Sequence, residues 1–456
     1  MNSNALKVSR FNHMVSKPDG TALGYNFLWR SLVLLDKNES PAFEKLIRSQ
    51  NDFDVESLNT VLDFSLLKKL RFLIPSTFDE IEFFKKSYEK SIARPVLTTM
   101  ILPTLRCNFD CPYCFEFKHD VDLSDETSDA IKSWVRSRLH DKRHFHITWF
   151  GGEPLLAKSR IEELSTFGID QAHRLGIKFS SSITTNGYLL DPETVGLLQR
   201  LQVNNVHITL DGDEDAHNTT RYLIGGGPSF DRLVENIEMY CRVSKSHLPL
   251  SIRVNVTDNN FDGISKLLKR FSQTVKRGSR VYFRWVWANE ASGFQQFVVK
   301  QKRPFEKLAL LYGLAADEGF IIDNPVDDTQ FNYCEVDFEH HFTIDPRGYI
   351  YLCSHKFDPS EAIGHVIDDP NVESDQFFEK WISANPFGDS RCLDCKCLPI
   401  CKGGCRKARV FGSKACIEER FSMDKYVESQ YSKHKVQTLY SGLTKSERSD
   451  GNASAI

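Results

Sequence analysis

The stretch Arg106-Cys107-Asn108-Phe109-Asp110-Cys111-Pro112-Tyr113-Cys114 is the point around which this chain is organised. Its three thiols have C-x3-C-x2-C spacing and follow an apolar, strand-like run, Thr98 to Leu105. Such a compact loop can bring three thiolates onto one inorganic cluster, and a cubane iron–sulfur cluster with only three protein ligands keeps one iron open for chemistry. The alternative is a structural zinc knuckle or a set of buried free cysteines, although zinc sites usually show two C-x2-C pairs or added histidines.

Length and composition narrow the class of protein. With 456 residues the chain exceeds one typical domain, so two or three are expected. A net charge of −3 without a long basic block gives nucleic acid binding no electrostatic support. The polar segment Met1 to Asp19 lacks the apolar core of a signal peptide, and no apolar run approaches the length of a membrane span. We therefore expect a cytoplasmic protein with neither membrane nor nucleic acid as a partner.

The twelve cysteines are unevenly distributed along the chain. Three lie at 107–114, Cys241 stands alone, and eight fall between Cys334 and Cys416. A reducing compartment disfavours a disulfide framework, so clustering indicates metal or cluster binding. Cys241 lies in a helical pattern and is expected to be a core residue.

The first 95 residues predict a small α+β domain, with residues 1 to about 20 disordered. Tyr25 to Asp36 predicts two short strands. Ser40 resembles a helix N-cap before Pro41, where proline is tolerated in the first turn. Apolar spacing then predicts helical segments over Val55–Phe64, Leu66–Leu70 and Asp79–Ser91.

From Thr98 the chain alternates between strand and helix patterns. Candidate strands are Thr99–Leu105, His146–Phe150, Lys178–Thr185, Val206–Leu210, Ser251–Thr257 and Val281–Val286. Candidate helices are Asp125–Leu139 with Ser124 as its cap, Ser159–Leu175, Pro192–Leu201, Phe230–Val243, Phe261–Thr274 and Pro304–Glu318. Six strand–helix repeats imply a parallel sheet with helices outside it, as an open sheet or a barrel.

Polar and glycine residues follow four successive strands. Cys107 follows the first, Gly151-Gly152-Glu153-Pro154 the second, Asn186-Gly187 the third and Asp211-Gly212 the fourth. Ligands of parallel α/β folds bind at the carboxyl ends of the strands, so these residues predict one shared site. A strand-to-helix turn would explain Gly and Pro at 151–154, but it leaves Glu153 and the second glycine unexplained. Asn-Gly alone is a common turn pair.

The cysteine loop together with Gly-Gly-Glu-Pro resembles the radical S-adenosylmethionine (SAM) enzymes. The resemblance implies a partial (β/α)6 barrel over residues 96–320 and a [4Fe-4S] cluster held by Cys107, Cys111 and Cys114. In that family the open iron chelates the methionine end of SAM, and one electron from the cluster cleaves the sulfonium to a 5′-deoxyadenosyl radical.

The same resemblance implies a set of SAM contacts. Ile208-Thr209-Leu210-Asp211-Gly212, then His217-x3-Arg221, resembles the Ser-Leu-Asp-Gly and His-x4-Arg pattern of the maturase branch, with a threonine for the serine and the arginine one residue closer. The implied contacts are Gly151, Gly152 and Glu153 to the amino group, Thr209 and Arg221 to the carboxylate, Asn186 to the ribose and Tyr113 beside the adenine. Ordinary loop packing is the alternative for Tyr113, and the run Arg253-x-Asn255-x-Thr257 is a lesser candidate.

Seven of the C-terminal cysteines resemble the SPASM domain, which holds two auxiliary iron–sulfur clusters and would span residues 321–432. The pattern is Cys334, Gly348-x4-Cys353, Cys392-x2-Cys395-x5-Cys401-x3-Cys405 and Cys416. The resemblance assigns Cys392, Cys395, Cys401 and Cys416 to one cluster, and Cys334, Cys353 and Cys405 to the other. The fourth ligand of the second cluster stays open between an open iron, a non-cysteine ligand and Cys397. A pair of zinc sites is the alternative, and His340, His341 and His355 are expected to be exposed or satisfied rather than ligands.

These resemblances predict a maturase of a ribosomally made peptide that forms a thioether or carbon–carbon cross-link. The N-terminal domain resembles the winged-helix-like peptide clasp of such enzymes, where a leader peptide adds a strand to a sheet edge. Expected partners are a precursor peptide with its leader and a reductant such as flavodoxin or ferredoxin. One alternative is an anaerobic sulfatase maturase that makes formylglycine. Ser354 argues against this alternative, because that group typically has an acidic residue directly after the cysteine that corresponds to Cys353. The other is a non-catalytic iron–sulfur or zinc scaffold. The polar tail 433–456 is expected to be disordered.

Overall fold

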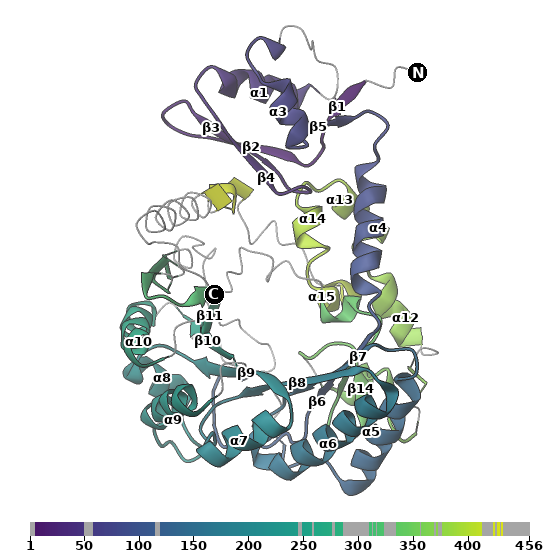
Figure 1. Cartoon of the computed structure of the whole chain (residues 1–456), viewed down its shortest axis with the longest axis vertical. Helices are drawn as coiled ribbons and strands as arrows, with labels where there is room; N and C mark the ends of the chain where they lie inside the picture. Colours follow the sequence, from purple (N-terminus) through teal and green to yellow (C-terminus); the bar gives the residue numbers. More distant parts are fainter. Residues whose placement is uncertain are drawn as a thin grey trace, which may run out of the picture. The chain divides into compact units, whose positions relative to one another are not determined.

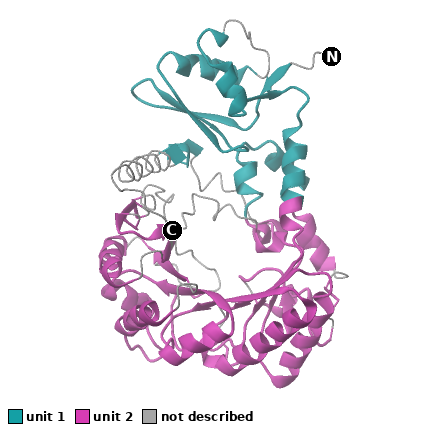
Figure 2. Cartoon of the chain, in the orientation of Figure 1, with its two compact units in different colours: residues 1–89, 386–404, 416–456 teal, residues 90–385, 405–415 magenta. Residues whose placement is uncertain are grey.

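The computed structural model describes residues 5–49, 58–114, 119–244, 249–257, 260–275, 279–285, 310–311, 313–315, 317–322, 334–355, 357–368, 371–372, 376–412, 423–424, 426–428 and 430–431. The chain forms two compact units (Figure 2). Unit 1 contains residues 1–89, 386–404 and 416–456, and unit 2 contains residues 90–385 and 405–415. The cysteine-rich C-terminal segment is therefore divided between the two units.

Unit 2 is built on one ten-stranded sheet, in the order β12-β11-β10-β9-β8-β7-β6-β13-β14-β15. Its parallel strands are β6 (Val96–Ile101), β7 (His144–Trp149), β8 (Lys178–Thr185), β9 (Val203–Leu210), β10 (Leu250–Val256), β11 (Arg280–Trp285) and β12 (Ile321–Ile322). Beside β6 lie β13 (His341–Ile344), which is parallel to it, and the antiparallel strands β14 (Tyr349–Tyr351) and β15 (Gly364–His365). The predicted α/β class with a central parallel sheet is confirmed.

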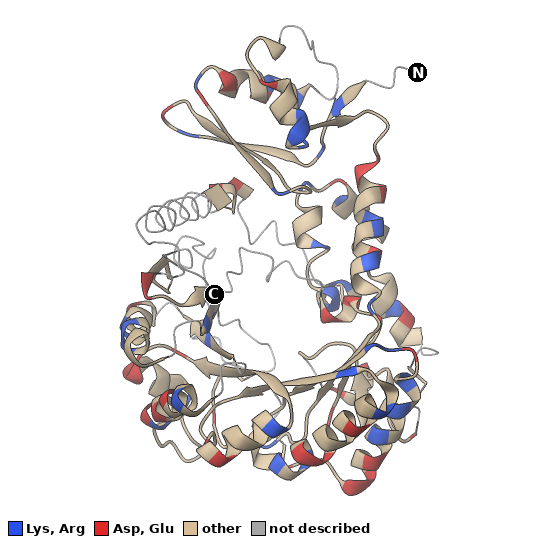
Figure 3. Cartoon of the chain, viewed as in Figure 1, with Lys and Arg blue, Asp and Glu red and all other residues tan. Residues whose placement is uncertain are grey.

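Helices cover the outer face of this sheet (Figure 1). They are α5 (Asp125–Arg138), α6 (Lys158–Leu175), α7 (Pro192–Arg200), α8 (Glu214–Thr220), α9 (Phe230–Val243) and α10 (Phe261–Thr274). Ser124 caps α5 as predicted, because its side chain accepts a hydrogen bond from the N–H of Thr127. Acidic and basic residues are mixed along α5, α6 and α7 (Figure 3). Within the described part of the chain, no helix has the length and hydrophobicity needed to cross a bilayer.

The sequence alternation along the strands explains which face is buried. In β7, Phe145, Ile147 and Trp149 are at most 1% exposed, whereas His146 and the other intervening residues are only partly buried. Successive strand side chains point to opposite faces, so the apolar set packs under the helices. The other set, which includes His146 and Thr209, lines the concave face of the sheet. Most of the intervening residues of β7 and β9 are polar.

Some predicted boundaries were wrong. The first strand ends at Ile101 rather than Leu105, because the backbone then leaves the sheet: the Leu105 N–H donates to the carbonyl of Val121. Helix α8 was not predicted separately. Much of the predicted helix Pro304–Glu318 lies outside the described residues, as does Val286 at the end of the predicted sixth strand.

Unit 1 contains a three-stranded antiparallel sheet of β2 (Asn12–Ser16), β3 (Ala22–Asn26) and β4 (Ser31–Leu35), and a second pair, β1 (Leu6–Val8) with β5 (Leu73–Pro75). The expected disorder was wrong for residues 5–20, which include β1 and β2, whereas residues 1–4 lie outside the described part of the chain. Short strands with few apolar residues give weak sequence signals, and pairing with β3 and β5 is what orders them.

The helices of unit 1 are α1 (Glu39–Arg48), α3 (Phe64–Lys69), α4 (Glu80–Ile92), α13 (Ser390–Leu393) and α14 (Leu398–Cys401). Helix α1 is preceded by Asn38 as N-cap, so the cap prediction at Ser40 was wrong by two residues. Most of the predicted helix Val55–Phe64 lies outside the described residues. In the turn η7 (Pro386–Gly388), Phe387 packs on Phe84 and Tyr88 of α4, with ring centroids 5.7 and 5.2 Å apart.

The partly buried His146 generates a prediction for pH dependence. Burial lowers its pKa from 6.5 to about 4, and both ring nitrogens contact serine hydroxyls, Ser180 at 2.8 Å and Ser182 at 3.1 Å. Because the unfolded chain takes up this proton first, the free energy of unfolding falls as the pH drops from about 6.5 towards 4. Between pH 7 and pH 5 the free energy of unfolding of His146→Gln should therefore fall by about 2 kcal/mol less than that of the wild type, measured by urea unfolding.

The matched control is His173→Gln, because His173 is exposed on α6. It should keep the wild-type pH dependence. Equal pH dependence in both variants would contradict a neutral, buried His146.

Candidate active site at the strand ends

Backbone contacts hold the cysteine loop against the end of β7. The N–H of Glu153 donates to the carbonyl of Arg106 at 2.7 Å, and the N–H of Gly152 donates to the carbonyl of Thr104 at 3.2 Å. A Cβ atom on Gly152 would lie 2.1 Å from the Arg106 carbonyl oxygen. Gly151 adopts a φ of +109°, which disfavours any other residue. The two glycines are therefore required by the close approach of two backbones.

The opposite side of the loop is held by the segment after α8. The N–H of Asp110 donates to the carbonyl of Tyr222 at 2.8 Å, and the N–H of Ile224 donates to that of Asn108 at 3.0 Å. Phe109 is fully buried between these contacts. The three thiols, Cys107, Cys111 and Cys114, stay partly exposed. The loop is thus fixed at both sides, and its three cysteines are only partly buried.

Two N–H groups point at the first thiol. The Phe109 N–H lies 3.4 Å from the Cys107 Sγ, and the Asn186 side-chain amide lies 3.9 Å from it. The same Asn186 amide donates to the Asn108 Oδ1 at 2.7 Å. Such donors stabilise negative charge on sulfur, which is the state of a cluster ligand.

Glu153 is completely buried and joins the ends of β7 and β8. Its carboxylate accepts hydrogen bonds from the Thr185 hydroxyl at 2.7 Å, the Asn186 N–H at 2.7 Å and the Leu155 N–H at 3.0 Å. Burial raises the pKa of Glu153, while these donors oppose that rise. In this structure the carboxylate therefore fixes the geometry of the site.

A polar network centred on Asp211 lies beside the loop. Its carboxylate accepts hydrogen bonds from the hydroxyl of Tyr113 at 2.5 Å, the hydroxyl of Thr220 at 2.6 Å and the amide of Asn255 at 3.0 Å. The Asn255 amide also reaches the Tyr113 oxygen, at 3.1 Å. Burial and the Asp211 charge raise the pKa of Tyr113 well above its usual range, so the phenol stays protonated.

Arg221 is buried beneath the same network. Its Nη1 donates to the Tyr113 oxygen at 3.1 Å, and its guanidinium lies 5.5 Å from the centroid of the Phe109 ring. Within the described part of the chain, its buried Nε has no hydrogen-bond partner. A buried cation with a donor to spare suits an anionic ligand, and a carboxylate fits a guanidinium best.

The structure thus brings together most of the predicted site residues of this domain: Cys107, Cys111, Tyr113, Cys114, Gly151, Gly152, Glu153, Asn186 and Arg221. Thr209 lies on β9 opposite Arg253 of β10 in the parallel register. Asp211 was expected at the shared site only as part of the Asp-Gly pair that ends a strand, without a contact of its own, and Thr220 was not predicted. Asn255, predicted only as a lesser candidate, is part of the network.

Three of the C-terminal cysteines belong to unit 2. Cys334 precedes the turn η4 (Glu335–Asp337), and its thiol accepts a hydrogen bond from the backbone N–H of Arg406, the residue after Cys405. Burial raises the pKa of Cys353 well above its usual range, and the charges of Glu335 and Cys334 raise it further. Burial raises the pKa of Cys334 to about 12. A bound metal cation would reverse both shifts, because a coordinating thiol is deprotonated.

The next group of cysteines belongs to unit 1. Cys392 lies in α13 and Cys401 ends α14, and the N–H of Cys395 donates to the carbonyl of Cys392 at 3.1 Å. Cys397 is 1% exposed. Cys416 lies outside the described residues, so its assignment with this group stays a prediction.

The comparison with protein families matches residues 101–268 to the radical SAM superfamily. The matched segment runs from the end of β6 into α10, and it contains the cysteine loop and the contacts described above. The chain therefore contains a radical SAM domain.

Relatives and solved structures agree with this. The chain is 23% identical over 365 residues to a cysteine-type anaerobic sulfatase-maturating enzyme of Clostridium perfringens, covering 73% of this chain and 95% of the relative. The structure of native anSMEcpe with bound AdoMet and the Cp18Cys peptide matches with a TM-score of 0.59 at 19% identity, over 77% of this chain and 99% of that one. Streptococcus suis SuiB bound to precursor peptide SuiA matches with a TM-score of 0.50 at 16% identity, over 92% and 99%. These likenesses show a shared fold.

The residues at the strand ends fit the groups that the family uses, namely SAM and a [4Fe-4S] cluster. The thiols of the loop meet the cluster's need for three ligands, and Arg221 with its spare Nε meets the need of a carboxylate. When bound, these groups supply a carbon-centred radical. The chain itself fixes the loop, holds Arg221 charged and keeps the Tyr113 phenol protonated.

Gly152→Ala tests the backbone clamp. The added methyl group meets a carbonyl at 2.1 Å and must displace the loop. We expect about four fewer irons per chain after anaerobic reconstitution, since one cubane cluster holds four.

Gly196→Ala is the control, because the nearest side chain that a Cβ would meet among the described residues is the flexible end of Arg200, at 3.8 Å. Normal iron content and normal reductive SAM cleavage in Gly152→Ala would contradict the clamp.

Proposed function

We propose that this protein is a radical SAM enzyme that oxidatively modifies a ribosomally made precursor peptide. The proposal rests on the bond between Arg221 and Tyr113, which lies in the cysteine loop of the radical SAM domain. Arg221 is buried, and its Nε has no hydrogen-bond partner among the described residues. A non-catalytic scaffold would have no use for this buried, charged and partly unsatisfied group, because such groups cost free energy.

In this proposal Arg221 binds the carboxylate of SAM, and the backbone around Gly151 and Gly152 borders its methionine end. Thr209, Asn186 and Tyr113 contribute further contacts. The Asp211 network holds Arg221 and Tyr113 in place. Glu153 positions Asn186, to which its carboxylate is hydrogen-bonded at 2.7 Å.

A peptide substrate is supported by two observations. The matched solved structures carry, by their own descriptions, a Cp18Cys peptide and the precursor peptide SuiA. In unit 1, β4 pairs with β3 on one side, and within the described residues no strand pairs with its other side. A free strand edge can accept an added strand from a leader peptide. We therefore assign residues 1–95 to leader recognition and residues 96–320 to the radical chemistry.

The expected product is a thioether or carbon–carbon cross-link, with loss of two hydrogens. The 5′-deoxyadenosyl radical removes one hydrogen atom from the peptide. The peptide then loses one electron and one proton, which accounts for the second hydrogen. We propose that auxiliary clusters within residues 321–432 accept that electron, and that a flavodoxin or ferredoxin supplies the electron for SAM cleavage.

Formylglycine formation is the second candidate, favoured by the sulfatase-maturating relative. Ser354 lacks the carboxylate that the maturases have there. However, the Glu335 carboxylate accepts hydrogen bonds from both the N–H and the hydroxyl of Ser354, at 2.7 and 2.6 Å. An acid therefore lies beside Cys353 from another part of the chain.

Cys111→Ala tests the central claim. Loss of one of three thiolates should abolish formation of 5′-deoxyadenosine and of modified peptide, because the cluster that reduces SAM is lost. Co-expression with a candidate precursor peptide followed by mass spectrometry gives the second readout. A mass lower by two hydrogens with linked fragments indicates a cross-link, whereas loss of sulfur with gain of an aldehyde indicates formylglycine.

The control is Cys241→Ala on the outer helix α9, which should retain both activities. Persistent 5′-deoxyadenosine formation by Cys111→Ala would disprove the proposed function.

Leu34→Asp tests leader recognition. Leu34 lies on the edge strand β4 and is 50% exposed, so the change should leave the fold intact. A charge beside an added strand should weaken binding of the leader peptide about tenfold, measured by fluorescence anisotropy. SAM cleavage without peptide should be unchanged.

Leu175→Asp, on α6 and 47% exposed, is the matched control. Equal peptide affinity in wild type and Leu34→Asp would remove β4 from the binding surface.

A further inference from the structure

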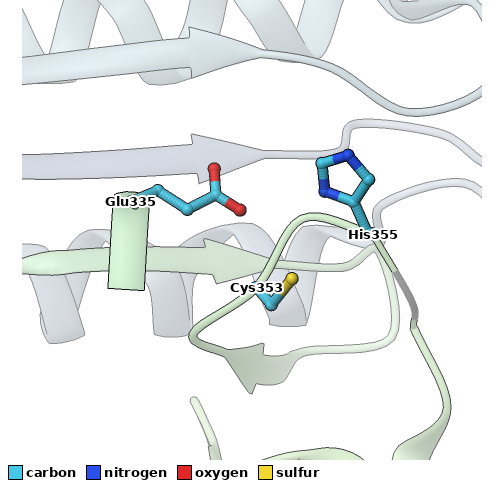
Figure 4. Close-up of side chains that lie close together, drawn as sticks. All are labelled: Glu335, Cys353 and His355. Carbon is cyan, nitrogen blue, oxygen red and sulfur yellow. The ribbon is translucent and has the colours of Figure 1, made fainter. Parts of the chain in front are cut away.

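Three side chains of different chemistry converge beside the unit 2 cysteines. A carboxylate oxygen of Glu335, the Sγ of Cys353 and a ring nitrogen of His355 all lie within 4.8 Å of one another (Figure 4). Cys334 lies close enough for its charge to act on Cys353, and its thiol bonds to the N–H that follows Cys405. The site therefore offers the thiols of Cys353 and Cys334, the Glu335 carboxylate and the His355 imidazole, with Cys405 next in the chain to the residue that bonds Cys334.

We propose that His355 is the fourth protein ligand of the cluster held by Cys334, Cys353 and Cys405. The inference deepens the proposed function and rests on its auxiliary clusters. Under this proposal the cluster has no open iron, because three thiolates and one imidazole bind it. Imidazole is an established ligand for iron in iron–sulfur centres, where it raises the reduction potential.

The hydrogen bonds of Glu335 favour the histidine over the carboxylate. Its Oε1 accepts two bonds from Ser354, and its Oε2 lies 3.5 Å from the Nε2 of His341. Binding iron through the carboxylate would break part of this set. Iron in a sulfur-rich site also prefers imidazole, since carboxylates suit harder cations.

The same serine orients the histidine. The Oγ of Ser354 lies 3.2 Å from the Nδ1 of His355 and donates to the Glu335 carboxylate at 2.6 Å. A ligating histidine usually binds a carboxylate or another polar group through its second nitrogen, which fixes the tautomer and the ring. Glu335 is then a positioning residue that acts through Ser354.

Cys397, the thiol outside the pattern, is the other candidate for this role. Cys397 belongs to unit 1, and its side chain is 1% exposed. His355 belongs to unit 2 together with the three thiols, is two residues from Cys353, and is exposed. The geometry given by the short Cys353-Ser354-His355 link does not depend on how the two units are arranged.

The test uses the full-length chain, reconstituted with iron and sulfide, labelled with ¹⁵N only at histidine and reduced without SAM. Electron–nuclear double resonance should show a ¹⁵N coupling on a reduced cluster. The coupling should disappear in His355→Ala and in His355→Cys, and His355→Cys should keep the full iron content because a thiolate replaces the imidazole. His365→Gln is the control and should keep the coupling, since His365 contacts Asp368 and Tyr349.

The possible failures are distinct. Reduced clusters without any ¹⁵N coupling, or a coupling that survives in His355→Cys, would disprove the histidine ligand and leave the proposed function standing. If the wild type shows no ¹⁵N coupling and Glu335→Gln loses the cluster, the Glu335 carboxylate is the fourth ligand instead. A chain that incorporates no iron beyond the Cys107 loop would instead remove the auxiliary clusters themselves.

Discussion

The site depends on one backbone contact, the approach of the Gly151–Glu153 turn to the carbonyl groups before Cys107. The Arg106 carbonyl accepts the Glu153 N–H at 2.7 Å and occupies the space in which any side chain on Gly152 would lie. Through Glu153 the contact extends to β8, because the buried carboxylate binds Thr185 and Asn186. The ends of the strands and the cysteine loop are thus joined by main-chain geometry and by one buried carboxylate.

Charge is arranged around this clamp with little solvent to screen it. Arg221 and Asp211 are both buried, at 8% and 2% exposure, and Tyr113 lies between them with hydrogen bonds to each. The opposite charges offset the desolvation that each would suffer alone. Because Asn255 also holds the Tyr113 oxygen and accepts a hydrogen bond from Arg253 at 2.9 Å, the network continues along the concave face of the sheet. The same Arg253 charge acts on His355, so the network beside the Cys107 loop and the residues around Cys353 share one electrostatic environment.

The sequence was sufficient to predict the parallel sheet, the outer helices and the loop residues at the strand ends, because hydrophobic periodicity and glycine positions are local signals. The bounds of β8, α9 and α10 were predicted to the residue. The structure was needed for contacts between distant residues. Nothing local to Asp211 indicates that it binds Tyr113, 98 residues away. The same holds for Glu335 and Ser354, and for the short strands β1 and β2, which are ordered by their partners.

The division of the chain also determines the order in which the protein can fold. Residues 1–89 are synthesised before the radical SAM domain. Phe387, which packs on Phe84 and Tyr88, and Leu393, whose carbonyl accepts a hydrogen bond from Arg10 at 2.7 Å, are synthesised about 300 residues later. Long-range closure of this kind slows folding and leaves apolar surface exposed during synthesis. Unit 1 therefore becomes complete only after the radical SAM domain has been synthesised, although its first strands are made before that domain.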